Sequence, residues 1–592
     1  MSTFAELSDI ANNAGQPELV YKLMELSTTS AMWNTRKGVA FALAGQSRER
    51  LDAHLPKLIP TLYRYIFDPN ERIASAMKQV WSSLVPDPKK ALTKYLGPVM
   101  AHLIEGVTDR LWRSREASCY ALAEALAGRT YAEVGPTLCE LHEKLIRCVD
   151  DIKDSVRKAA LAAWRSLSSV INRLCDGSLA PASQAEEVLG IILPGLIERG
   201  ISHASDDVRG LCTKQLLGVC KAAGTHIRPH VVTLVPALLE TLSVVEDPTL
   251  NYLQMHSESA GIAQGALEAA RLNAMRGSDA TGAIDTCLRV MDAPQLEAAL
   301  PAVMQLLKGG VGLPTRAGTA RFLVQLAQQH PLLLVPHAPK LLKSLFSASL
   351  HERSEVARGA YAAAAAQVAR GASAETLSKL VSHLTELYIS DEGGVEDSMR
   401  LAVGELTREL LRVATDAMNR VRAEWVALAF VGKHEPRSQK ENAEAQNKSQ
   451  REERGKLASM WLESYDEAGI TPSVLGLHLP EVLPLLTTIV HGPSWALRRA
   501  AAHGLLEIQD KVPKTMLKAE QAAEMGRLAA RLVEKRWRDK EMGEQAKQIE
   551  ALARAHGHAP KEEDKEEEEP KAGAKRAMAA ETAEEEADSG DI

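Results

Sequence analysis

The stretch Asp150–Ala160, DDIKDSVRKAA, decides how the rest of the chain is interpreted. It opens with acidic residues, and the side chain of Asp151 can cap the unpaired N–H groups of a first helical turn. Val156 and Ala160 follow at helical spacing and are expected to face inward, whereas Arg157 points away from this apolar stripe. The stretch therefore predicts a helix that starts just after an acidic turn.

The same short phrase, an arginine followed at helical spacing by a small or apolar residue, recurs along the chain. From one copy to the next, five intervals span 38 to 43 residues and two longer ones span 52 and 107 residues. Repeats made of a helix pair, of the HEAT or armadillo type, have a period of about 40–47 residues. Copies without the arginine are expected at Ala74 and Ala357. The predicted repeat-signature residues are Arg36, Asp109, Arg115, Asp151, Val156, Arg157, Arg209, Arg316, Arg400 and Arg498.

These repeats predict an all-α fold, a HEAT/armadillo-like α-solenoid with an ARM-type superhelix. The composition points the same way, because aromatic residues make up only 4% of the chain and no long alternation of β-forming residues occurs. At 592 residues the chain is also far longer than one ordinary globular core. Insertions or degenerate units are expected where the intervals lengthen.

Negative charge is concentrated at the C-terminal end. The formal net charge is −7, but residues 561–592 alone hold 13 acidic against 5 basic side chains. The remainder is close to neutral, which argues against nucleic acid as a partner, since nucleic-acid-binding proteins show a basic face. The composition of residues 557–592 predicts a disordered acidic C-terminal tail.

Changes in composition divide the chain into six predicted segments. These are N-terminal helices that continue a truncated solenoid (1–46), regular HEAT repeats (47–225), HEAT-like repeats of which some are degenerate (226–432), a charged loop (433–456), C-terminal HEAT-like helices with one long capping helix (457–556) and the acidic tail (557–592).

The seven cysteines, none of them in a C-x-x-C pair, are expected to be buried reduced thiols. The first 26 residues hold no apolar core of a signal peptide, and no apolar run approaches the ~18 residues of a membrane span. We therefore expect a soluble protein of the cytoplasm and nucleus that does not insert into membranes.

The sequence contains no motif of a catalytic or cofactor-binding site. A glycine-rich phosphate loop, H-E-x-x-H and G-x-S-x-G are all missing. Cys139, His142 and Cys148 share one stretch, but a single helix cannot supply a closed set of four metal ligands, so helical packing accounts for them better. We expect a protein without enzymatic activity, cofactor or metal.

Stacked helix pairs form a long surface suited to holding other proteins. The best candidate contact residues are Trp112, Arg113 and Arg115 in the phrase RLWRSREASC, because tryptophan and arginine are favoured anchors of protein interfaces. The alternative is that Trp112 only fills the turn between two helices.

Several longer phrases suggest a family. They are STFAELSDIANNAGQPELVYKLMELS, DRLWRSREASC, DDIKDSVRKAA, HIRPHVVTLVPALLETLSVVEDPTLNYLQMH, GSDATGAIDTCLRVMDAPQLEAALPAVMQLLKGGVGLPTRAGTA and WVALAFVGKHE. Over about residues 2–510 the chain resembles the C-terminal part of the large HEAT-repeat adaptor and scaffold proteins that associate with the proteasome. Family members are much longer, so we expect this chain to represent part of such a scaffold.

The resemblance implies a non-catalytic binding protein that helps to hold the core and regulatory particles of the proteasome together. It also implies a role in proteasome assembly, quality control or targeting. The repeat period alone would fit another helical-solenoid adaptor equally well, such as a nuclear-transport or cytoskeletal scaffold.

Overall fold

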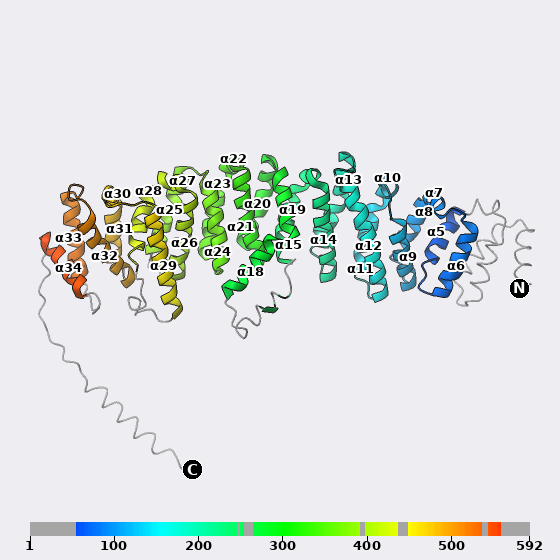
Figure 1. Ribbon diagram of the computed structural model, residues 1–592, viewed down its shortest axis with the longest axis horizontal. Coiled ribbons are helices and arrows are strands. Elements are labelled where there is room, and N and C mark those ends of the chain that lie inside the picture. Colours follow the sequence, from blue (N-terminus) through cyan, green and yellow to red (C-terminus); the bar gives the residue numbers. More distant parts are fainter. Residues whose placement is uncertain are drawn as a thin grey trace, which may run out of the picture. The chain divides into compact units, whose positions relative to one another are not determined.

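The computed structural model describes residues 55–244, 249, 252–253, 264–390, 397–435, 448–534 and 543–557. Every regular element in these ranges is a helix, which confirms the predicted all-α solenoid class (Figure 1). The predicted segment 1–46, the signature residue Arg36 and the acidic tail from residue 558 onward lie outside the described residues. Within the described ranges no helix is both long and apolar enough to span a membrane.

The helices are grouped into two compact units. Unit 1 comprises Met1–Leu380 and Glu405–Arg420, and unit 2 comprises Val381–Gly404 and Val421–Ile592. The border between them falls within two helices, α25 (Ala374–Ile389) and α26 (Asp397–Val413).

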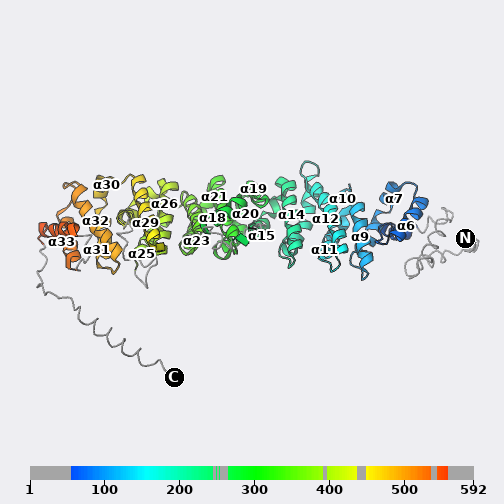
Figure 2. The ribbon, with the colours of Figure 1, turned by 60° about the horizontal axis from the view of Figure 1, so that its bottom comes forward.

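Unit 1 contains most of the described helices, and Figures 1 and 2 show them side by side, in chain order except that α18 lies next to α21 and α24. They are α5 (Leu55–Tyr65), α6 (Glu71–Leu84), α7 (Pro88–Lys94), α8 (Leu96–Gly106), α9 (Trp112–Ala125), α10 (Tyr131–Val134), α11 (Leu138–Val149), α12 (Asp154–Cys175), α13 (Ala182–Pro194), α14 (Asp206–Ala223), α15 (Val231–Val244), α18 (Gln264–Arg276), α19 (Asp279–Val290), α20 (Ala293–Gly309), α21 (Leu313–Gln329), α22 (Pro331–Leu334), α23 (Ala338–His351), α24 (Glu355–Ala369) and α27 (Thr415–Arg420).

Short helical turns link some of these helices, namely η1 (Gly135–Thr137), η2 (Gly195–Gly200), η3 (Gly224–His230) and η4 (Val335–His337). The helices of unit 2 that follow residue 421 are α28 (Arg422–Gly432), α29 (Lys448–Glu467), α30 (Pro472–Leu477), α31 (Leu479–His491), α32 (Trp495–Lys511), α33 (Ala519–Glu534) and α34 (Gly543–Ala555).

Short polar residues and prolines define where many helices begin. The Asp87 carboxylate accepts a hydrogen bond of 3.1 Å from the backbone N–H of Lys90, with proline at the first position of α7. At the start of α20, Asp292 and Gln295 form a reciprocal capping box. These contacts satisfy backbone groups that a helix start leaves unpaired.

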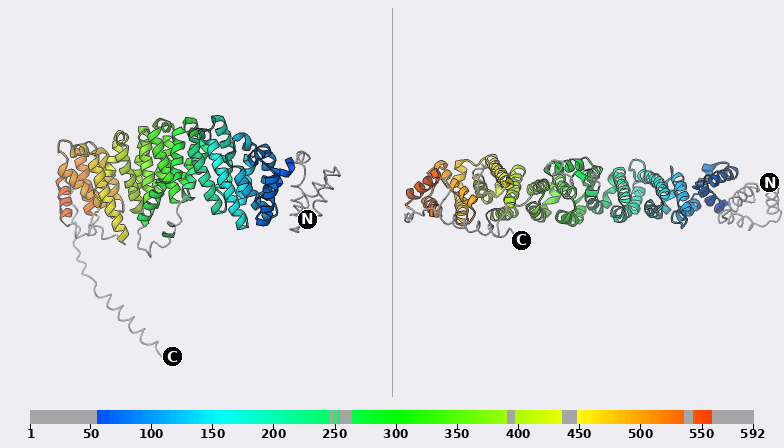
Figure 3. Two further views of the ribbon diagram at one scale, coloured as in Figure 1. Left: turned by 45° about the vertical axis from the view of Figure 1, so that its right-hand side comes forward. Right: turned by 90° about the horizontal axis from the view of Figure 1, so that it is seen from below.

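Neighbouring repeats of unit 1 bury their apolar faces on one another. The helix α12 packs against α9 on one side and against α14 on the other, while α11 packs against α8 and α13, so two rows of helices lie back to back (Figure 3). Ala159, Ala160 and Ala163 of α12 are fully buried, and their small side chains allow close helix contact. Because each helix pair contacts mainly its neighbours, stability accumulates along the row instead of in one central core.

The end of the chain differs from the predicted single long capping helix. The structure has two helices there, α33 and α34, which pack against each other, and residues 535–542 between them lie outside the described part. Each helix carries a buried apolar stripe, which includes Met525, Leu528 and Leu532 in α33 and Ile549 and Leu552 in α34. One straight helix could not bury these two stripes against each other.

The predicted charged loop 433–456 is wrong at both of its ends. Lys433 and Glu435, directly after α28, are only 7% and 3% exposed, and α29 already begins at Lys448. Lys433 Nζ donates to Glu507 at 2.8 Å, and Glu435 accepts a hydrogen bond of 2.9 Å from the buried Tyr388 hydroxyl. These charges are paired inside unit 2 instead of solvated, whereas residues 436–447 lie outside the described part.

Candidate protein-contact surface

Several signature arginines donate hydrogen bonds to backbone carbonyl groups of the turn that precedes their own helix. Nη1 of Arg115 donates to the carbonyl oxygens of Asp109 and Arg110 at 3.0 and 3.1 Å. Arg157 makes the same pair of bonds to Asp151 and Ile152 at 2.8 and 3.2 Å. In each case the acceptors lie six and five residues before the arginine, in the turn that follows the preceding helix. The guanidinium therefore pairs with two carbonyl groups of the turn, which lie beyond the end of the preceding helix.

Two more signature positions repeat this geometry. Arg209 Nη1 donates to the carbonyl oxygens of His203 and Ala204 at 2.6 and 2.9 Å. In unit 2, Arg498 Nη1 donates to the Gly492 carbonyl oxygen at 2.9 Å. The shared geometry explains the recurring sequence phrase as a structural feature of the repeat.

Arg115 also joins its repeat to the next one. Its Nε and Nη2 donate to the two carboxylate oxygens of Asp151 at 2.7 and 2.9 Å, a bidentate ion pair. Asp151 additionally accepts a bond of 2.9 Å from the backbone N–H of Lys153. The prediction that Asp151 caps the helix is therefore wrong, because α12 begins at Asp154 and Asp151 faces the preceding repeat.

The charge of Asp151 is stabilised by these contacts. Burial raises the pKa of its carboxyl, but the hydrogen bonds from Arg115 and from the Lys153 backbone outweigh burial, so the pKa lies below its usual value. The carboxylate consequently remains charged in the folded protein at neutral pH.

The repeat expected at Ala357 does contain a signature arginine, which is Arg358. This residue lies 42 residues from both Arg316 and Arg400, so the spacing could have identified it. Its Nε donates to Glu405 at 2.6 Å and its Nη1 contacts the Glu352 carbonyl oxygen at 3.5 Å. With 7% of its surface exposed, Arg358 plays the part that Arg115 plays earlier in the chain.

The other signature residues occupy different surroundings. Arg316 pairs with Glu352, with 3.1 Å between Nη1 and Oε2. Arg400 donates to the Ser494 hydroxyl at 3.2 Å, and Val156 is fully buried in the face of α12.

The Trp112 patch, defined as Leu111, Trp112, Arg113, Ile152 and Lys153, lies at the turns before α9 and α12. Trp112 is half-buried, with Arg113 Cζ 5.4 Å and Lys153 Nζ 5.2 Å from its ring centroid. The neighbouring Leu111 and Ile152 are 69% and 99% exposed. An aromatic ring that contacts two cations and lies near exposed apolar side chains is typical of a protein-contact site.

The three predicted contact residues thus have different surroundings in the structure. Trp112 and Arg113 lie at the surface, whereas Arg115 is held in the bridge to Asp151. Sequence analysis missed Leu111 and Ile152. Their position in polar inter-helix turns, where an apolar side chain has no core to enter, is the feature that could have identified them.

The side chains of Cys139, His142 and Cys148 do not come together as a set of metal ligands. Cys139 is exposed, contrary to the expectation that all seven cysteines are buried, whereas Cys148 is buried with its sulfur 3.6 Å from that of Cys119. His142 is buried, and burial lowers its pKa to about 4. Among the described residues, no three histidine, cysteine or acidic side chains come together as metal ligands would.

The helix pairs and the arginine geometry define the class of protein, a HEAT-type α-solenoid. Residues 227–389 match the family described as proteasome adapter and scaffold protein ECM29, HEAT-repeat domain. The human proteasome adapter and scaffold protein ECM29 is 35% identical over 514 residues, which cover 86% of this chain and 27% of the human protein. The Saccharomyces cerevisiae proteasome component ECM29 is 25% identical over 527 residues, covering 87% of this chain and 27% of the yeast protein.

Among solved structures, Kap121p aligns with a TM-score of 0.38 at 14% identity, over 92% of this chain and 51% of Kap121p. The expected resemblance to the proteasome-associated HEAT-repeat adaptors is confirmed by the family match and the relatives. The chain spans about a quarter of the length of these relatives.

Proposed function

We propose that this chain is a non-catalytic adaptor and scaffold segment that binds the proteasome. The observation that carries the proposal is the 35% identity, over 86% of the chain, to the human protein named as a proteasome adapter and scaffold. The class of fold supports it, because a row of helix pairs offers an extended surface for holding other proteins.

The finer parts of the proposal follow from the resemblance. The segment would contact the core and regulatory particles, help to hold them together and support proteasome assembly, quality control or targeting. It would act in the cytoplasm and nucleus, without a cofactor.

We place one contact at the Trp112 patch. Its exposed apolar side chains and its tryptophan in contact with two cations have the composition of an interface anchor. Arg115 is not part of the proposed contact, because replacing it would break the bridge to Asp151 and confuse a folding defect with a binding defect.

The test is capture of purified proteasomes on the immobilised 592-residue chain. The double variant Trp112→Ala, Arg113→Ala is compared with Trp495→Ala. Trp495 is a matched control because it is also a half-buried tryptophan at the first position of its helix, with Arg499 Cζ 5.4 Å from its ring centroid. Circular dichroism shows whether each variant is folded.

We expect the unaltered chain and the Trp495 variant to retain core and regulatory subunits and the Trp112 variant to retain fewer. Equal retention by both variants would remove the Trp112 patch from the proposal. Failure of the folded, unaltered chain to retain any subunit would refute proteasome binding by this chain.

A further inference from the structure

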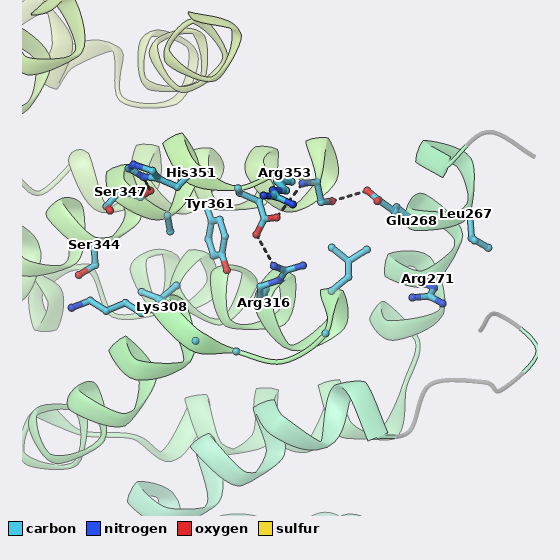
Figure 4. Close-up of a pocket in the computed structure, with 18 residues that line it drawn as sticks. Leu267, Glu268, Arg271, Lys308, Arg316, Ser344, Ser347, His351, Arg353 and Tyr361 are labelled. Atoms are coloured by element: carbon cyan, nitrogen blue, oxygen red, sulfur yellow. Dashed lines mark hydrogen bonds and ion pairs between the residues drawn. The ribbon is translucent and has the colours of Figure 1, made fainter. Parts of the chain in front are cut away.

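We propose that a cavity in unit 1, bordered by α18, α20, α21, α23 and α24, binds an acidic peptide segment of a partner protein. The cavity has a volume of about 910 Å³ and is lined by charged and polar side chains from all of these helices (Figure 4). The cavity would provide one of the contacts of the proposed scaffold, so this inference rests on the proposed function.

Basic side chains outnumber acidic ones around this cavity. The lining holds four side chains that are positively charged at neutral pH, and two carboxylates. The basic residues are Arg271 of α18, Lys308 of α20, Arg316 of α21 and Arg353 of the turn between α23 and α24. A cavity with this excess of positive charge attracts anionic groups.

Both carboxylates are already engaged in the wall. Glu352 pairs with Arg316 at 3.1 Å and accepts a bond of 3.0 Å from the backbone N–H of Ser354. Glu268 accepts a bond of 2.6 Å from the Ser354 hydroxyl. These bonds hold the acidic groups in place, so they help to order the turn before α24.

Two buried hydrogen-bond donors in the lining have no acceptor among the described residues. The Tyr361 hydroxyl, in a side chain only 1% exposed, has no partner there, and neither does the buried Nε of Arg316. Figure 4 shows the Tyr361 ring beside Arg316, between the residues labelled on the two sides of the cavity lining. Burial raises the pKa of Tyr361 to about 12, so its hydroxyl keeps its proton at neutral pH. Buried donors of this kind are normally paired, and a ligand oxygen would pair them.

The arrangement of the basic groups favours a peptide over a single small anion. In Figure 4, Lys308 and Arg271 lie at opposite ends of the cavity, with Arg316 and Arg353 between them. Separated cations match carboxylates spaced along a chain better than the oxygens of one phosphate. Gly309 also lines the cavity, and the space where its side chain would lie is open, which leaves room for a peptide backbone.

The test measures binding of a fluorescein-labelled hexaglutamate peptide to the purified 592-residue chain by fluorescence anisotropy. The cavity variant is Lys308→Glu, Arg353→Glu, whose two side chains are both exposed. The control is Lys340→Glu, Lys343→Glu, which makes the same change of charge at exposed positions of α23 outside the cavity lining. A second variant, Tyr361→Phe, removes only the buried hydroxyl.

We expect the cavity variant to bind the peptide at least about tenfold more weakly and the control to bind nearly as well as the unaltered chain. Tyr361→Phe should weaken binding about fivefold. Binding should also weaken as salt rises from about 50 to about 300 mM. Equal weakening by the cavity variant and the control would overturn the inference, because it would show non-specific attraction.

Inorganic phosphate and inositol hexakisphosphate serve as competitors. If the inositol phosphate binds to the cavity and the peptide does not, the peptide proposal is wrong. Proteasome capture is run separately on the same variants, so a chain that binds the peptide but no proteasome would refute only the proposed function. A chain that captures proteasomes but does not bind the peptide would refute only this inference.

Discussion

At the scale of single residues, Arg115 shows how one side chain serves both its own repeat and the next. Its guanidinium closes the turn before α9 and also binds Asp151 with two hydrogen bonds. The Asp151 side chain is largely buried and has 10% of its surface exposed. Loss of either partner would leave a poorly solvated charge without compensation.

We therefore expect Asp151→Ala to destabilise the contact between α9 and α12 by about 1.5–3 kcal/mol, the usual value of hydrogen bonds to a charged group. Hydrogen exchange of the amides in these two helices measures the change locally, which suits a repeat protein better than one global unfolding midpoint. Asp150→Ala is the control, because Asp150 is the exposed neighbour. The same loss of protection in both variants would contradict the assigned role of Asp151.

The lowered pKa of Asp151 also predicts a dependence on pH. A carboxyl group whose folded-state pKa is depressed stabilises the protein above its unfolded pKa, about 3.9, and this contribution is lost as the pH falls. The difference in opening free energy of α9 and α12, measured by hydrogen exchange, between the unaltered chain and Asp151→Asn should thus be largest near neutral pH and should shrink below about pH 4. A difference that stays constant down to pH 3 would show that the charge of Asp151 is not responsible.

The sequence allowed part of this surface to be predicted. The arginine spacing located Arg115 and Arg157, because a regular period is visible in the sequence alone. The spacing could not show that Arg115 is paired with Asp151 while Arg113 lies at the surface, because both arginines belong to the same helix and differ only in the direction they face. Which arginine is paired depends on the position of Asp151 in the next repeat.

At the scale of elements, the end of α28 shows how charged residues become part of a core. Lys433 Nζ and His434 Nε2 both contact the Glu507 carboxylate of α32, at 2.8 and 2.9 Å. Burial raises the pKa of Glu507, but these two partners outweigh burial and hold the pKa far below its usual value. A composition rule assigns such charges to a solvated loop because it cannot detect partners more than 70 residues away.

Lys433→Ala should destabilise unit 2 by about 3–5 kcal/mol, because it removes one partner of a buried ion pair. Lys511→Ala is a matched control, since Lys511 contacts the same Glu507 at 3.3 Å but is 57% exposed. Its loss should cost only about 0–1 kcal/mol. Hydrogen exchange of the amides in α28 and α32 compares the two variants. Equal loss of protection in Lys433→Ala and Lys511→Ala would contradict a buried role for Lys433.

Close helix packing predicts opposite effects for two glycine-to-alanine changes. A Cβ on Gly432, in α28, would lie 2.5 Å from the buried ring of Trp461, so Gly432→Ala should cost about 1–3 kcal/mol. Gly359, within α24, has open space at that position, so Gly359→Ala should stabilise its helix by about 0.5–1 kcal/mol. Denaturation curves of the two variants test the contrast, and a stabilising Gly432→Ala would show that α28 and α29 pack less tightly.

At the scale of the whole molecule, local patterns predicted the fold class well because each repeat is built from short-range contacts. The helix of Asp154–Cys175 and its buried face follow from spacing alone. The packing of α33 on α34 was missed, because the apolar stripes that contain Leu528 and Ile549 also fit one long amphipathic helix when only the sequence is considered. Apart from the charged loop 433–456 and the single capping helix, the predicted segments and their boundaries remain predictions.

The most direct test of the account is whether the purified, fluorescently labelled chain migrates with purified proteasomes in size-exclusion chromatography. We predict that part of the label elutes with the proteasome, well ahead of the position of the free 64.2 kDa chain. An excess of unlabelled chain should displace the label. If the folded chain elutes only at its own position over a wide range of proteasome concentrations, this chain is not a proteasome-binding scaffold segment.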